Sequence, residues 1–132
     1  MSARTVLQAA LLAAVGEAGV VAFDAPPVRR AVPHAVIEEP VLAALDAAGV
    51  VGRIGTIAVT VTDAGAGGGE RPERLREMIT TVEAAVTAMA GNLAEGWRIA
   101  GLRLTRSRIA RAKGDQWIGS SEFSVRLFRI DS

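Results

Sequence analysis

The residues with the clearest potential for chemistry form a glycine-rich run at positions 63–70. The run follows a β-branched segment and precedes a helical one, which is the context of a phosphate-binding turn. Gly65 and Gly67 begin a dinucleotide fingerprint, but Glu70 stands where the third glycine is required. A carboxylate at the start of the next helix also repels a phosphate. We therefore expect a flexible loop and no nucleotide or other cofactor.

Other catalytic or metal-binding sets are weak. His34 is the one histidine of the chain, and cysteine is absent. Zinc sites use several histidine or cysteine ligands, and no serine here is framed by the glycines of a nucleophile elbow. Glu38 and Glu39 are adjacent, so on a strand they point to opposite faces and form no catalytic pair. The sequence predicts neither an enzyme nor a metalloprotein.

A third group of polar residues lies between two segments, 97–104 and 123–130, in which apolar residues alternate with arginines. Such alternation is typical of strands with one buried face. We expect a hairpin whose connecting segment projects and contacts another protein. The alternatives are a solvated strand face and a nucleic-acid-binding finger with one stacking ring. The expected contact residues are Arg106, Arg108, Arg111, Lys113, Asp115, Gln116 and Trp117.

Charge is distributed unevenly along the chain, although the net charge is only +1. Residues 1–96 contain 7 basic and 11 acidic side chains, whereas residues 97–132 contain 8 basic and 3 acidic ones. A basic end on one copy can therefore complement the acidic body of another copy.

Several elements are expected to position these groups. Residues 3–15 are rich in alanine and leucine with one apolar stripe, and residues 71–89 repeat apolar positions at helical spacing, so both predict helices. Residues 56–62 are β-branched and predict a strand, and shorter strands are expected at 20–23 and 34–38. Residues 41–48 fit either a helical turn or an irregular excursion. Glycines at positions 49, 52 and 55 argue against a long regular element there.

Together these elements predict one α+β domain over residues 1–132. We expect a mostly antiparallel sheet of about four strands with both helices packed on one face. Half of the residues are apolar but only 4% are aromatic, so the core should be aliphatic. No apolar run approaches the roughly 20 residues that a membrane span needs, and we expect no membrane partner. The lack of cysteine fits a reducing compartment.

The order and spacing of these segments resemble the tail completion, or tail terminator, family of long-tailed phages and phage-derived gene transfer agents. The resemblance covers nearly the whole chain and rests on no catalytic motif. Its parts are the Leu-Gln-Ala-Ala-Leu-Leu-Ala-Ala helix, the Val-Ala-Phe-Asp-Ala-Pro-Pro passage, the Pro-His-Ala-Val and Thr-Ile-Ala-Val-Thr-Val strands, the helix at 71–89, and the hairpin from Trp-Arg-Ile-Ala-Gly-Leu-Arg-Leu to Arg-Leu-Phe-Arg-Ile.

The resemblance implies a hexameric ring in the neck of a phage-like particle, assembled in the bacterial cytoplasm. Such a ring caps the tail tube and meets the head-side connector, and we expect DNA to cross its lumen. A head–tail stopper or adaptor ring is the nearest alternative, followed by a small nucleic-acid-binding domain. Besides the hairpin tip at 106–116, we expect the loop to contact neighbours. The loop residues are Asp63, Gly65, Gly67, Gly68, Gly69, Glu70 and Arg71.

Overall fold

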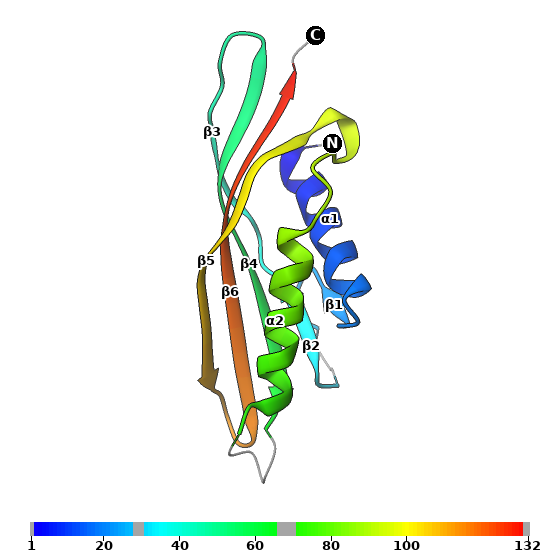
Figure 1. Ribbon diagram of the computed structural model, residues 1–132, viewed down its shortest axis with the longest axis vertical. Coiled ribbons are helices and arrows are strands. Elements are labelled where there is room, and N and C mark those ends of the chain that lie inside the picture. Colours follow the sequence, from blue (N-terminus) through cyan, green and yellow to red (C-terminus); the bar gives the residue numbers. More distant parts are fainter. Residues whose placement is uncertain (1, 28–30, 66–70, 131–132) are drawn as a thin grey trace.

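The computed structural model describes residues 2–27, 31–65 and 71–130. These residues form two α-helices, six β-strands and one short 3-10 turn (Figure 1). The elements are α1 Ala3–Glu17, β1 Ala22–Phe23, β2 His34–Ile37, β3 Val41–Ala44, β4 Val50–Ala64, α2 Glu73–Thr87, the 3-10 turn Ala94–Gly96, β5 Arg98–Arg111 and β6 Gln116–Ile130. The α+β class agrees with the sequence, but the sheet has six strands where about four were expected.

All six strands belong to one sheet. The order is β1-β2-β4-β6-β5, and β3 pairs with a separate part of β4. The β1–β2 pair is parallel and the other pairs are antiparallel. Both helices lie against one face, as predicted, and no described helix covers the other face (Figure 1). The fold therefore has two layers, with one sheet face dry and the other open.

The core fills the space between the sheet and the two helices. Ile57, Val59 and Val61 of β4 are at most 1% exposed, as their alternation predicted. Phe123 and Leu127 of β6 are also fully buried. The helices supply mostly aliphatic side chains, each worth about 1.5–3 kcal/mol when fully buried. These are Val6, Leu7, Leu11, Val15, Leu75, Ile79, Val82 and Val86.

The helix boundaries differ slightly from those predicted. α1 continues to Glu17, two residues beyond the expected end. α2 begins at Glu73, directly after Pro72, and ends at Thr87 rather than near Gly91. Such differences of a few residues at helix ends are common, because terminal turns lack part of their hydrogen bonding.

Residues 41–44 and 50–55 lie in strands, contrary to both sequence interpretations, and residues 45–49 connect them. β3 pairs with the first part of β4, and β4 runs unbroken through Gly52 and Gly55. A Cβ atom at Gly55 would collide with the carbonyl oxygen of Val41, and one at Gly52 would collide with the carbonyl oxygen of Leu45. These glycines therefore permit a close backbone approach rather than ending a strand.

The C-terminal hairpin is longer and its turn is shorter than predicted. Only residues 112–115 connect β5 to β6, and Gly114 adopts a positive φ of 61° in this turn. Residues 106–111, expected in a projecting connector, are paired with β6 instead. The register of β5 shifts twice, between Ile99 and Gly101 and between Leu104 and Arg106. These bulges interrupt the period-2 pattern by which a continuous strand is detected in a sequence.

The glycine at position 55 provides a test of the β3–β4 contact. We expect Gly55→Ala to lower the free energy of unfolding by roughly 1–3 kcal/mol, because the new methyl group meets a backbone atom. Urea unfolding would measure the change. Gly101→Ala in β5 is the control, since no atom lies within 4 Å of the added Cβ. Equal unfolding midpoints for the two variants would contradict the close approach of β3.

Candidate functional site

The two predicted contact segments meet at one end of the molecule. The last residue pair between β4 and β6 joins Ala64 to Gln116. The Gly65 amide then donates to the carbonyl oxygen of Asp115 at 2.6 Å. The hairpin turn, which includes Lys113, and the start of the loop therefore share this end (Figure 1). The predicted contact residues Gly67, Gly68, Gly69 and Glu70 lie outside the described residues.

Asp63 is a structural residue rather than part of a flexible loop. It lies in β4 with no exposed surface. Its carboxylate accepts from the Arg74 Nε at 2.8 Å and from the same guanidinium's terminal nitrogen, and also from the Ala64 amide at 2.8 Å. The pKa of Arg74 is raised, first by its hydrogen bond to Asp63 and second by the negative charge of that carboxylate. Asp63 therefore joins β4 to α2 and presents no side chain to a partner.

Arg71, at the other end of the predicted loop segment, is exposed. Its guanidinium forms an ion pair with Glu73 at 3.3 Å. The pair is solvent-accessible on both sides, so it contributes little to stability. Arg71 thus remains accessible to a neighbour.

Trp117 is packed on the helix side of the sheet. The ring is half-buried against the core, and the Arg111 guanidinium lies 5.7 Å from its centroid. Register also places these two residues opposite each other on β5 and β6. This arrangement differs from a projecting finger in which Trp117 stacks on a base, because the indole packs on the helix side of the sheet beside Arg111.

Four arginines of β5 share the sheet face that the helices leave open. Register pairs Arg98 with Phe128, Arg103 with Ser124, Arg106 with Glu122, and Arg108 with Ser120. These β6 partners alternate with the buried Phe123, Val125 and Leu127, so they point away from the helices. Without the two bulges, Arg103 would face the side opposite to Arg98 and Arg106. The bulges therefore gather the arginines on one surface.

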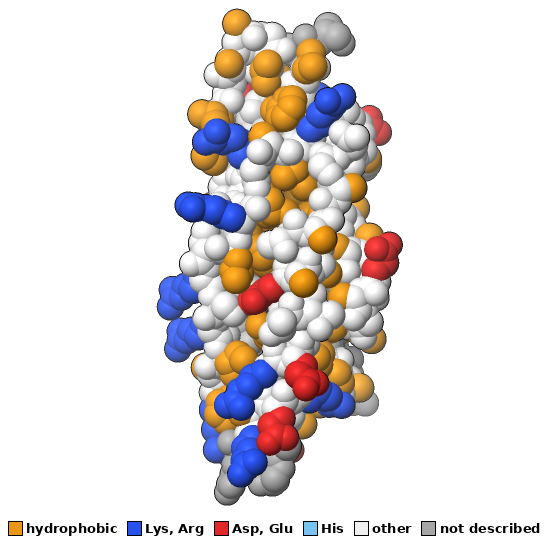
Figure 2. All heavy atoms as spheres, in the orientation of Figure 1, with side chains coloured by type: hydrophobic (Ala, Val, Ile, Leu, Met, Phe, Trp, Pro, Cys, Tyr) orange, Lys and Arg blue, Asp and Glu red, His pale blue; other side chains and the backbone are white. Residues whose placement is uncertain are grey.

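We call this surface the basic face, defined by Arg98, Arg103, Arg106, Arg108 and Arg126. Each of these side chains is exposed. Glu122 is in register with Arg106. It is the acidic residue of β4, β5 and β6 that lies on this open side of the sheet. Figure 2 shows basic side chains along the margin of the molecule on the side of β5, away from the helices. Guanidinium groups in this arrangement favour carboxylate or phosphate partners.

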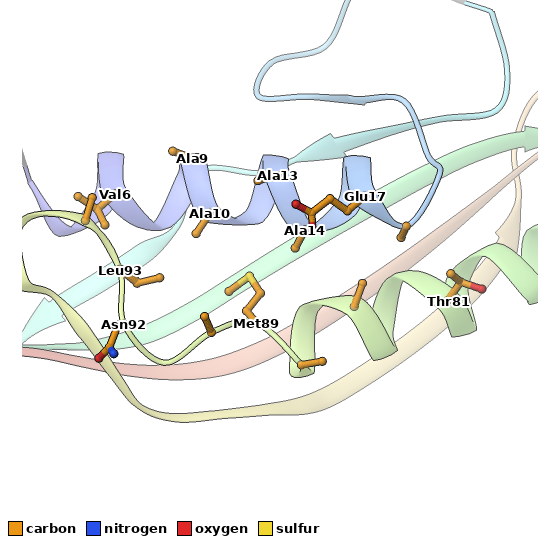
Figure 3. Close-up of a pocket in the computed structure, with 15 residues that line it drawn as sticks. Val6, Ala9, Ala10, Ala13, Ala14, Glu17, Thr81, Met89, Asn92 and Leu93 are labelled. Carbon is orange, nitrogen blue, oxygen red and sulfur yellow. The ribbon is translucent and has the colours of Figure 1, made fainter.

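A second surface lies on the opposite layer, between α1 and α2 (Figure 3). It is an open hollow of about 690 Å³. We call it the helix groove. Ala10 and Ala14 of α1 point toward the side that carries Met89 and Leu93 (Figure 3). The remaining lining residues are Val6, Ala9, Ala13, Glu17, Ala18, Thr81, Ala85, Ala88, Ala90, Asn92 and Ala94.

The chemistry of the helix groove is unlike that of a small-molecule site. Ligand pockets place several convergent polar groups among apolar ones to fix the orientation of the ligand. Here the polar lining residues are Glu17, Thr81 and Asn92, and the others are mostly alanines. Sequence analysis missed this surface, although alanines at positions 9, 10, 13 and 14 extend the apolar stripe of α1 around the helix. The groove suits a shallow contact with an apolar protein surface.

The described residues include no cluster suited to a metal ion. No group of three or more histidine, aspartate or glutamate side chains there could hold a metal ion. His34 is buried on β2 beside Phe23, and Ser121 is buried and donates to Glu83 of α2 at 2.6 Å. Among the helices of the described chain, none has the length and apolarity that crossing a membrane would require.

Comparison with known proteins identifies a fold. No protein-family model and no curated protein sequence matches the chain. A chain of the solved structure described as "Virion of native gene transfer agent (GTA) particle" is similar, with a TM-score of 0.63 and 20% sequence identity. The match covers 96% of this chain and 95% of that chain. The two chains therefore share one fold along nearly their full lengths.

The contrast between Asp63 and Asp115 can be tested by stability. We expect Asp63→Ala to lower the melting temperature by about 5 °C or more, since it leaves the part-buried Ala64 amide without its side-chain acceptor and removes the tie to α2. Asp115→Ala is the matched control, because its side chain is exposed and its carbonyl oxygen is retained. Thermal unfolding followed by circular dichroism measures both. Similar melting temperatures would show that Asp63 has no such structural role.

Proposed function

We propose that this protein is a structural component of a phage-like virion, and that it forms a ring at the top of the tail. The observation that carries the proposal is the shared fold with a chain of a gene transfer agent virion. The similarity extends over 96% of one chain and 95% of the other, so it involves the whole domain rather than a common small motif. The absence of a predicted catalytic set in the sequence accords with a structural role.

The two surfaces suit assembly into a ring. The basic face and the helix groove lie on opposite layers and differ in chemistry. A contact between unlike surfaces of identical chains is heterologous, and it closes into a ring when the rotation between copies divides a full turn. We propose six copies in a tail terminator that caps the tail tube and meets the head-side connector. DNA would pass through the lumen of this ring.

The oligomeric state in solution and the position in the particle test this proposal. Size-exclusion chromatography with light scattering should give a mass near six times 13.7 kDa. Cryo-electron microscopy of particles should show a ring of this fold seated on the tail tube. A ring placed only against the head would favour a stopper or adaptor. A strictly monomeric protein that is absent from the neck would contradict the proposal.

The basic face should contribute to assembly. We expect Arg106→Glu with Arg108→Glu to weaken association of the ring about tenfold or more, because like charges then face an acidic neighbour. Both side chains are exposed, so the melting temperature should stay within about 2 °C of the wild type. Arg111→Glu, on the same strand but on the helix side, is the control. Unchanged association of the double variant would refute this assignment.

The same variant evaluates nucleic-acid binding as a second candidate function. The observation that favours it is the gathering of five arginines on one open sheet face. Wild-type protein would then be retained on duplex DNA at low salt and released as salt increases, because phosphate contacts displace counterions. The double arginine variant would lose this retention. A wild-type protein that passes unretained through a DNA column at low salt would exclude this function.

A further inference from the structure

The hairpin made by residues 41–54 carries an exposed apolar surface at one end of the molecule. We call this hairpin the arm. The exposed fractions are 69% for Val41, 47% for Leu45 and 36% for Ile54. The alanines at positions 43, 44, 47 and 48 are exposed as well, and Asp46 is the one acidic residue of the hairpin. An apolar projection of this kind usually marks a site of protein contact.

Hydrogen bonds hold the arm in a defined shape. Ala47 and Val50 exchange two backbone hydrogen bonds of 3.0 Å, and the Leu45 amide donates to the Gly52 carbonyl at 3.0 Å. The Asp46 carboxylate accepts from the Gly52 amide at 3.0 Å and from the Arg53 guanidinium at 3.2 Å. The arm is therefore preorganised, and docking it would order few additional residues.

The apolar side chains of the arm share the open side of the sheet. Register pairs Val41 with Thr56 and Ala43 with Ile54, so these residues lie on the side away from the helices. Ile130 is 64% exposed and pairs with Val50, next to the turn of the arm. The surface is thus built from β3, the start of β4 and the end of β6.

The helix groove offers the matching surface on the same chain. Its walls are mostly alanines, whose small side chains allow another backbone to approach closely. The arm extends past the end of the helix layer, whereas the groove lies along that layer (Figure 1). The arm therefore lies away from the groove of its own chain.

Charge favours the same pairing. Arg126 is exposed and in register with Ile54 on the open side of the arm. Glu17 is exposed in the lining of the groove. Arg126 beside the arm can therefore pair with Glu17 beside the groove of another copy. Such a pair helps to fix the register of the contact.

We propose that the arm of one copy docks into the helix groove of the next copy. Each copy then donates one arm and accepts one, so the contact is heterologous and propagates around a ring. The inference rests on the proposed ring and assigns its subunit contact to two named surfaces. A small molecule or another virion protein in the groove is an alternative that the following experiment distinguishes.

Cysteine cross-linking tests the pairing directly, because the chain contains no native cysteine. Leu45→Cys in the arm combined with Ala14→Cys in the groove should yield a ladder of covalent oligomers under oxidation, which reductant reverses. Mixing the two single variants should yield covalent dimers containing one of each. Leu45→Cys combined with Ser107→Cys on β5 is the control and should yield no ladder. Absence of the Leu45–Ala14 product in rings that form normally would overturn the proposal.

A substitution in the arm provides an independent measurement. We expect Leu45→Asp to shift the protein from rings to monomers, with at least a tenfold weaker association, since it places a charge in an apolar contact. Val21→Asp is the control, as Val21 is 62% exposed and belongs to neither surface. Rings that persist in Leu45→Asp would overturn the arm assignment while leaving the proposed function intact. A monomeric wild-type protein would instead contradict the proposed function itself.

Discussion

The fold depends on one long antiparallel ladder, in which all 15 residues of β4 pair with the 15 residues of β6. Side chains of a strand alternate between faces, so this ladder separates a dry face from an open one over its full length. The dry face carries Ile57, Val59 and Phe123. The second edge of β4 is divided between β2 and β3, and the second edge of β6 belongs to β5. Both the arm and the basic face are extensions of this ladder.

The helix layer is held to the ladder by apolar packing and by polar ties from α2. Arg74 of α2 binds the buried Asp63 of β4, and Glu83 of α2 accepts from the buried Ser121 of β6. Both ties connect α2 to the two central strands, which fixes its position on the sheet. α1 packs beside it, and the alanines between them leave the helix groove. A buried polar group must keep its partner, so these ties resist displacement of α2.

Local patterns in the sequence predicted much of the fold. The β-branched run at 56–62 lies inside β4, and its predicted dry residues Ile57, Val59 and Val61 are buried. The two helices were also predicted, because a helical period can be recognised in consecutive residues. Their packing on one face of the sheet was predicted as well. Solved structures add that this fold occurs in a gene transfer agent virion. Of the predicted contact residues, Arg106 and Arg108 are exposed on an open surface.

The tertiary structure decided the features that depend on residues far apart in the chain. Gly52 and Gly55 resembled strand breakers, yet they lie within β4 because β3 approaches them closely. The arginines of β5 share one face only because two bulges shift its register against β6. The composition and helical period of α1 were determined by the sequence alone. The groove, the arm and the basic face required the packing of distant elements, which no local period encodes.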